Sequence, residues 1–155
     1  LTLSSKKIYS SYNLVKSLET QLEFRNGDIS VDRFLLNLGK LGAADILGEI
    51  SKKKKFRNFK FESNIFVDNQ KKFLSKFGIY KRKEISPSMF VSGNFDLDNL
   101  RFSIYEISDN EKLKIEDVNY IEKEFNKIML DKGYESLFYF PNFKEFISII
   151  NGEMK

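Results

Sequence analysis

The sequence contains no cysteine, no histidine and no tryptophan. Without cysteine it has neither a disulfide framework nor a thiolate metal site. Without histidine it lacks the usual acid–base residue of enzymes and the commonest ligand of zinc. It also has no apolar run long enough to cross a membrane and no secretory signal segment. From these absences we expect a cytoplasmic protein with no cofactor.

What the sequence does contain is typical of a folded protein. Of its 155 residues, 31% are charged and 15% are aromatic, which differs from the composition of disordered chains. A chain of this length is most simply one domain. We therefore expect a single α+β domain over residues 1–155, with a helical subregion over residues 4–55. The first residue is Leu rather than Met, as it would be in a fragment or a processed product.

Positive charge is concentrated in the middle of the sequence. Residues 1–50 hold six basic and six acidic side chains, residues 51–84 hold twelve and three, and residues 85–155 hold eight and thirteen. The net charge of +4 therefore combines a positive middle segment with a negative C-terminal half. Such segregation bears on the choice of partner and not on the fold.

The clearest structural signal is an antiparallel hairpin over Met89–Ser108. Apolar and polar residues alternate on both sides of a two-residue turn at Asp98-Asn99, as in a hairpin with one buried face. Asp96 then faces Arg101 on the polar side, and a shift by one residue would bury both charges. The predicted apolar face includes Val91, Phe95, Phe102, Ile104 and, at its end, Glu106. An isolated hairpin is unstable in water, so we expect other elements to cover this face.

Before the hairpin, apolar residues repeat mostly at helical spacing. Steps of three and four predict helices over Ser4–Arg25, from Asp28 or Ser30 to about Leu41, and over Ala43–Lys55. Asn26-Gly27 is interpreted as the stop between the first two. A DNA-binding helix-turn-helix does not fit, because polar residues and glycine fall on its core positions. An antiparallel helical pair fits better.

The remaining segments give a mixed pattern. Alternation predicts strands over 59–67, 79–85 and 134–140, and helical spacing predicts helices over 69–78, over 115–131 and from Pro141 onward. The expected fold class is therefore α+β, with N-terminal helices followed by a mixed region built on an antiparallel β-hairpin (89–107) that C-terminal helices pack against.

Catalytic motifs are weak. The stretch Gly39-Lys40-Leu41-Gly42 lacks the glycine spacing and the hydroxyl residue of a phosphate loop, and Ser92-Gly93 lacks the glycines of a nucleophile elbow. One set of carboxylates would suit Mg²⁺ and a metal-dependent hydrolase: Asp96, Asp98, Glu106 and Asp109. In the predicted register, however, Glu106 lies on the face opposite Asp96, and aspartate is common in turns for backbone reasons. A metal site is therefore the least favoured hypothesis, and we do not expect an enzyme.

Lysine and arginine interleave with aromatic residues between residues 52 and 83. Positive charge attracts phosphate backbones, and exposed rings stack on bases. The leading hypothesis is thus a non-catalytic protein that binds an anionic partner, with nucleic acid first and an acidic protein surface second. The predicted binding residues are Lys52, Lys53, Lys54, Lys55, Arg57, Lys60, Lys81, Arg82 and Lys83. An equally weighted interpretation makes the rings core and the lysines a solvated face.

A second functional hypothesis is a protein–protein interaction module of the immunity, antitoxin or adaptor type. It would use the acidic C-terminal half or the edge of the hairpin. The two hypotheses differ in one measurable property, because phosphate binding depends steeply on salt concentration. No membrane partner is expected, and the sequence leaves the oligomeric state open.

Overall fold

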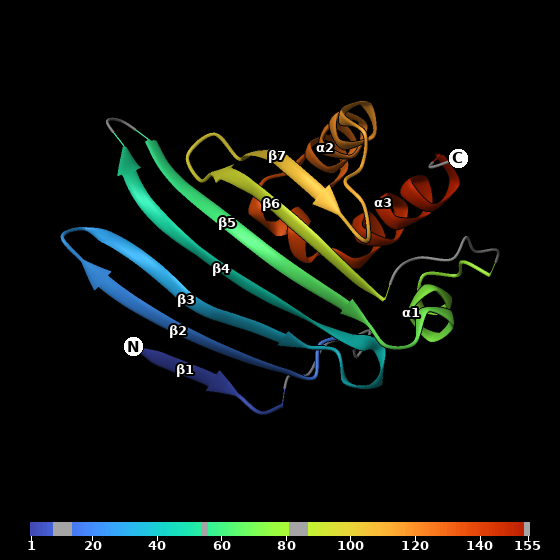
Figure 1. Cartoon of the computed structure of the whole chain (residues 1–155), viewed down its shortest axis with the longest axis horizontal. Coiled ribbons are helices and arrows are strands. Elements are labelled where there is room, and N and C mark those ends of the chain that lie inside the picture. The colour runs from blue at the N-terminus through green and yellow to red at the C-terminus, as the bar shows by residue number, and fades with distance from the viewer. Residues whose placement is uncertain (8–13, 54–55, 81–86, 154–155) are drawn as a thin grey trace.

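The chain forms one antiparallel sheet with helices against one of its faces, in a computed structural model that describes residues 1–7, 14–53, 56–80 and 87–153 (Figure 1). Seven strands of the described residues lie side by side in chain order. They are β1 (Thr2–Ser5), β2 (Ser17–Arg25), β3 (Asp28–Asn37), β4 (Gly42–Lys53), β5 (Phe56–Val67), β6 (Ser88–Asp96) and β7 (Arg101–Ser108). The helical elements described are α1 (Gln70–Lys76), α2 (Ile115–Met129), α3 (Phe140–Glu153) and the 3-10 helices η1 (Gly39–Leu41) and η2 (Tyr134–Phe138).

The strand register sorts the side chains onto two faces. Residues directly opposite one another on adjacent strands share a face, because successive side chains of a strand alternate. The face that includes Phe61, which we call the apolar face, is mainly apolar along the rows that cross the sheet, with Ser63 and Thr20 as polar members. One row contains Ile104, Gly93, Phe61, Gly48, Val31 and Leu22, the next contains Ile107, Val91, Ser63, Ile46, Phe34, Thr20 and Leu3, and the row on the other side contains Phe95, Phe59, Ile50, Ile29 and Phe24.

The opposite face is mostly polar. Lys60 faces Glu49 on one neighbouring strand and Asn94 on the other, and Asn58 faces Ser51 and Asp96 in the adjacent row. Opposite charges and amides therefore meet across the strands of this face. A sheet that is apolar on one side and polar on the other is the usual form of an antiparallel sheet with one solvated face.

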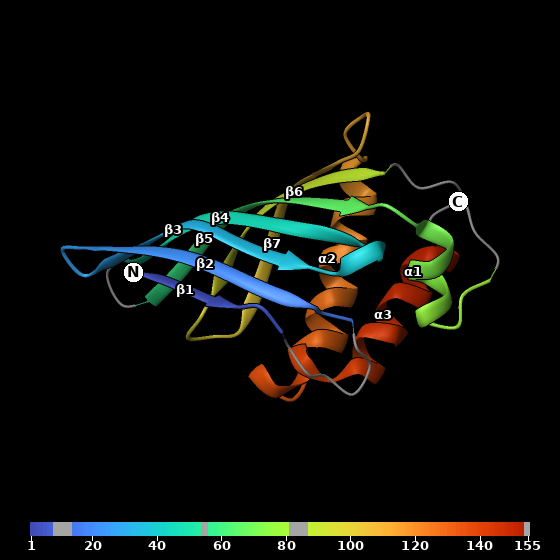
Figure 2. The same ribbon diagram turned by 90° about the horizontal axis from the view of Figure 1, so that it is seen from below.

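Helices α2 and α3 pack on one end of the apolar face. Helix α2 contacts β7 and helix α3 contacts α2, and the buried cluster at this junction includes Ile104, Ile107, Val118 and Ile121. The ring of Phe102 stacks against Phe61 at a centroid distance of 5.1 Å and against Phe125 of α2 at 4.6 Å. In Figures 1 and 2, β1 and the β2–β3 hairpin extend well beyond these helices.

The outer edge of β7 is covered by side chains of α2. Asn126 accepts a hydrogen bond from the amide of Phe102 at 2.8 Å and donates one to its carbonyl at 2.7 Å. The carboxylate of Glu122 accepts a hydrogen bond from the amide of Ile104 at 2.8 Å. These two side chains replace the partners that an eighth strand would provide, and so protect this edge from pairing with another chain.

The hairpin predicted over Met89–Ser108 is confirmed, but its register and its turn differ from the prediction. β6 ends at Asp96 and β7 begins at Arg101, so residues 97–100 form the connection instead of the predicted two-residue turn. Four pairs from Asp96–Arg101 to Gly93–Ile104 follow the predicted register. The register then shifts at a bulge, so that Ser92 faces Glu106 and Val91 faces Ile107. Ile107 therefore ends the apolar face and Glu106 lies on the polar one, contrary to the prediction. The positive φ of the turn also falls on Leu100, at 52°, and not on Asp98 or Asn99.

The three helices predicted before residue 55 are wrong, and with them the expected N-terminal helical subregion (4–55) and the α+β class. The described residues of this part form β1–β4, and the protein is mainly strands with its two longer helices at the C-terminal end. Asn26-Gly27, interpreted as a helix stop, is instead the tight turn of the β2–β3 hairpin, with φ of 50° and 88° at the two residues. Positive φ at both positions is the requirement that Asn-Gly meets in hairpins.

A β-bulge explains why β3 resembled a helix. The register of β3 shifts between Val31 and Phe34, so these two residues, three apart, lie on the same face. A spacing of three followed by Leu35 and Leu38 imitates a helical stripe. Residues 8–13 of the first predicted helix lie outside the described residues.

Most of the elements predicted after residue 55 are confirmed. The strand over 59–67 is confirmed as part of β5, and the helices over 69–78, over 115–131 and from Pro141 are confirmed as α1, α2 and α3. The strand predicted over 134–140 is wrong, because Tyr134–Phe138 form a 3-10 helix. Of the strand predicted over 79–85, Ile79 and Tyr80 belong to no strand and residues 81–85 lie outside the described residues.

Candidate functional site

Four of the nine predicted basic residues lie on two strands that the structure describes. Lys52 and Lys53 end β4, while Arg57 and Lys60 belong to β5. Lys54, Lys55, Lys81, Arg82 and Lys83 lie outside the described residues. The assignment of all nine residues to one binding surface therefore stays a prediction.

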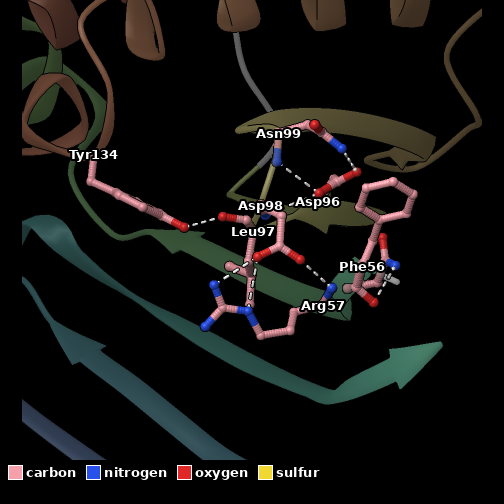
Figure 3. A network of polar contacts seen from close by, with 8 residues as sticks. Phe56, Arg57, Asp96, Leu97, Asp98, Asn99 and Tyr134 are labelled. Carbon is pink, nitrogen blue, oxygen red and sulfur yellow. Dashed lines mark hydrogen bonds and ion pairs between the residues drawn. The ribbon is translucent and has the colours of Figure 1, made fainter. Parts of the chain in front are cut away.

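Arg57 is engaged in an ion pair within the protein (Figure 3). Its Nε and Nη2 donate to one carboxylate oxygen of Asp98 at 2.9 and 2.6 Å, and its backbone amide donates to the other at 2.6 Å. These hydrogen bonds, and then the charge of the carboxylate, raise the pKa of Arg57. The contact joins the start of β5 to the β6–β7 turn, so the first role of this arginine is to position that turn.

The same turn is held by two further contacts. One carboxylate oxygen of Asp96 accepts hydrogen bonds from the amides of Asp98 and Asn99 at 3.0 and 2.9 Å, and the other accepts one from the side-chain amide of Asn99 at 2.8 Å. The hydroxyl of Tyr134 donates to the carbonyl of Leu97, as Figure 3 shows. The bonds from Asn99 lower the pKa of Asp96. Asp96 thus stabilises the turn, although the register does place it opposite Arg101 as predicted.

The carboxylates weighed as a metal site do not converge. The bulge moves Glu106 to the face of Asp96, but Glu106 pairs with Lys112 at 2.5 Å, and Asp109 accepts hydrogen bonds from the amides of its own loop. Asp98 is paired with Arg57. Within the ranges that the structure describes, no three acidic side chains come together as a cation would require.

The hollow beside the β6–β7 turn has a structural explanation. Its lining includes Asn99, Arg101, Glu122, Lys123 and Asn126. Glu122 and Asn126 are the side chains that cover the edge of β7, and Asn99 closes the turn. The polar groups of this hollow are therefore largely occupied by the protein's own backbone.

One surface without an evident internal role is the part of the apolar face on β1–β4. Phe24 is 59% exposed, Leu3 51% and Leu1 64%, and most of the surrounding residues are half-buried. We call this set the open apolar face: Leu1, Leu3, Leu18, Leu22, Phe24, Ile29, Phe34, Leu36, Ile46 and Ile50. The sequence predictions missed it because they assigned the same residues to the buried stripes of helices.

Few polar groups interrupt the open apolar face. None of the rows through Leu18, Thr20, Leu22 and Phe24 contains a charged residue. The side chain of Thr20 is the exception near its centre. It is only 7% exposed, and its hydroxyl has no hydrogen-bond partner among the described residues. A surface with this composition recognises apolar groups and offers almost nothing to a charged one.

Comparisons with known proteins add no constraint. The chain matches no family model, no curated protein and no solved structure. No helix in the described ranges is long and apolar enough to cross a membrane. The class that fold and surface define is therefore an antiparallel sheet protein with one face partly covered by C-terminal helices and partly open.

Proposed function

We propose that this chain is a non-catalytic binding protein that holds the acyl chain of an anionic, single-chain amphiphile against its open apolar face. One observation carries the proposal. The apolar rows that form the core beneath α2 continue without a charged residue across β4, β3 and β2, yet the main helix–sheet contact lies at β7. Exposed apolar side chains that gather on one face, here Leu1, Leu3 and Phe24, are typical of a binding surface.

An acyl chain suits this surface better than a protein does. The rim of a protein–protein interface is polar, and such interfaces carry about one hydrogen bond per 100–200 Å². The open apolar face offers side chains such as Leu22, Phe24 and Ile29 in adjacent positions and no charged partner. Each methylene that an acyl chain buries there contributes about 0.8 kcal/mol without requiring a hydrogen bond.

The positive charge of the β4–β5 hairpin supports an anionic head group. Lys52 and Arg57 are register partners, two residues further along their strands than the apolar pair Ile50 and Phe59. These basic positions therefore lie beside the middle of the row that contains Phe24, next to Ile50 and Phe59. Because Arg57 is already paired with Asp98, a carboxylate or phosphate head attached to a chain on this face would be attracted to the charge of Lys52.

The proposal is tested by titrating the protein with cis-parinaric acid, a fluorescent long-chain fatty acid. Phe24→Ser removes an exposed ring from the open apolar face, and we expect it to weaken binding about tenfold, the effect of losing ~1.5 kcal/mol of apolar contact. The matched control is Leu47→Ser, since Leu47 is 43% exposed and lies on the polar face opposite Glu62. Absence of saturable binding, or equal losses in both variants, would contradict the proposal.

Nucleic acid is the second candidate, and one observation favours it. The lysines at the end of β4 and Arg57 at the start of β5 come together at a hairpin, which concentrates positive charge. Binding of duplex DNA that weakens with a salt slope of ~0.9 per phosphate contact, and that is lost in Lys53→Gln with Lys54→Gln but not in Lys123→Gln with Lys127→Gln, would support this candidate. Such a result without fatty-acid binding would replace the first proposal.

A further inference from the structure

The two edges of the sheet differ in how they are protected. On β7, Asn126 and Glu122 occupy the outward backbone groups of Phe102 and Ile104. On β1 no described residue does so. Strand β1 has no charged residue and no proline, and its pairing with β2 shows no bulge. Natural sheets use these devices to prevent edge-to-edge pairing, so their absence marks β1 as an edge open to pairing.

The hydrogen-bond pattern identifies which backbone groups are available. Leu1 donates to the carbonyl of Leu22 at 2.6 Å and accepts from its amide at 2.7 Å. In an antiparallel pair such doubly bonded positions alternate with positions whose amide and carbonyl point away. Leu3 and Ser5 therefore bond inward to β2, as Leu1 does, and Thr2 and Ser4 direct their amides and carbonyls to the free edge.

We propose that two copies of this chain associate through β1, in antiparallel pairing about a two-fold axis at Leu3. In this register Thr2 of one copy faces Ser4 of the other, and each such pair exchanges both of its hydrogen bonds. Leu3 faces Leu3 of the second copy at a position without backbone bonds, where side chains approach most closely. An interface in which the same strand pairs with itself is self-complementary, as a two-fold interface requires.

The side chains of β1 agree with this register. Leu1 and Leu3 lie on the apolar face and are 64% and 51% exposed, so pairing joins the apolar faces of the two copies and reduces the exposure of both leucines. Thr2 and Ser4 lie in the rows of Gln21 and Glu19 on the polar face. Pairing through β1 therefore also joins the polar faces of the two copies. Within Leu1–Ser5 no like charges meet.

The test measures the self-association of the chain by analytical ultracentrifugation over a range of concentrations, without lipid. We expect a monomer–dimer equilibrium in the unmodified protein. Thr2→Lys with Ser4→Lys sets like charges opposite each other in both pairs and should weaken dimerisation by about tenfold or more. Thr2→Lys with Ser4→Glu changes the same positions but sets opposite charges together, so dimerisation should be retained.

A proline substitution separates edge pairing from folding. Ser4→Pro removes an outward amide, which an edge strand tolerates, and should abolish the dimer while leaving the thermal midpoint of the monomer nearly unchanged. Leu3→Pro removes an inward amide and should destabilise the β1–β2 pairing itself. A protein that is monomeric at all concentrations, or that dimerises equally with both charge patterns, would overturn the proposal. Neither outcome bears on fatty-acid binding.

Discussion

Two aspartates of one turn show how position decides the role of a side chain. Asp98 pairs with Arg57 and so ties the β6–β7 turn to β5, whereas Asp96 accepts three hydrogen bonds from the turn's own residues. Both carboxylates are thereby satisfied within the protein. This is the physical reason why acidic residues close in sequence to one another do not form a cation site here.

The lowered pKa of Asp96 makes part of the stability dependent on pH. Its hydrogen bonds with Asn99 and Asp98 favour the ionised carboxylate, so the contribution is complete above the unfolded pKa of about 4 and is lost as the pH falls through the lower folded value. We expect Asp96→Asn, measured by urea denaturation, to be less stable than the unmodified protein at pH 7. That difference should shrink as the pH falls below about 4.

Asp131→Asn is the matched control, because Asp131 is exposed at the end of α2. It should change the free energy of unfolding at pH 7 by less than about 0.5 kcal/mol. If Asp96→Asn and Asp131→Asn gave the same pH dependence, the assigned role of Asp96 would be wrong.

At the scale of elements, α2 has two tasks. Its apolar residues, Val118 and Ile121 among them, pack on the sheet, and its polar residues Glu122 and Asn126 complete the backbone hydrogen bonds of β7. The second task explains why asparagine is placed on a half-buried surface of this helix. Its side-chain amide both donates and accepts, as the edge of a strand requires.

Removing that amide should destabilise the protein measurably. Asn126→Leu leaves the amide and carbonyl of Phe102 without a partner next to the packed helix, and a buried polar group left unsatisfied costs about 1–3 kcal/mol. Urea denaturation measures the loss. The control is Asn119→Leu, at an exposed position of the same helix, which should change stability by less than about 0.5 kcal/mol. Equal losses would show that the edge contacts contribute little.

At the scale of the whole molecule, stability is distributed unevenly along the sheet. The ring contacts of Phe61, Phe102, Phe125 and Phe146 link β5 and β7 to both C-terminal helices, while β1 consists of four exposed residues at the opposite edge. Elements with few buried apolar contacts open locally at a lower free energy than the core does.

Amide hydrogen exchange should therefore show a gradient across the sheet. We expect the amides of β6, β7 and α2 to exchange near the rate of global unfolding, and those of β1 and the outer part of β2 to exchange much faster. At concentrations that favour the proposed dimer, the amides of Thr2 and Ser4 should gain protection. Uniform protection across the seven strands would contradict this distribution.

Local pattern alone determined the elements around the helix-packed core. The alternation in Met89–Ser108 favours a two-faced hairpin, and the longer run of helical spacing over 115–131, which includes Val118, Ile121 and Phe125, favours a helix. Both were predicted from sequence, as was the pairing of Asp96 with Arg101. A turn signal was also present in Asn26-Gly27, but its interpretation depended on the elements assigned beside it.

Whether residues 14–53 form helices or strands was decided only by the tertiary structure. Short apolar runs with spacings of two, three and four suit a helix or a bulged strand equally well, and pairing with neighbouring strands selects the strand. The bulge between Val31 and Phe34 is invisible without its partner β4. The open apolar face exists only because the register aligns Phe24 and Ile29 of one hairpin with Ile50, which lies on the next strand and 21 residues further along the sequence than Ile29.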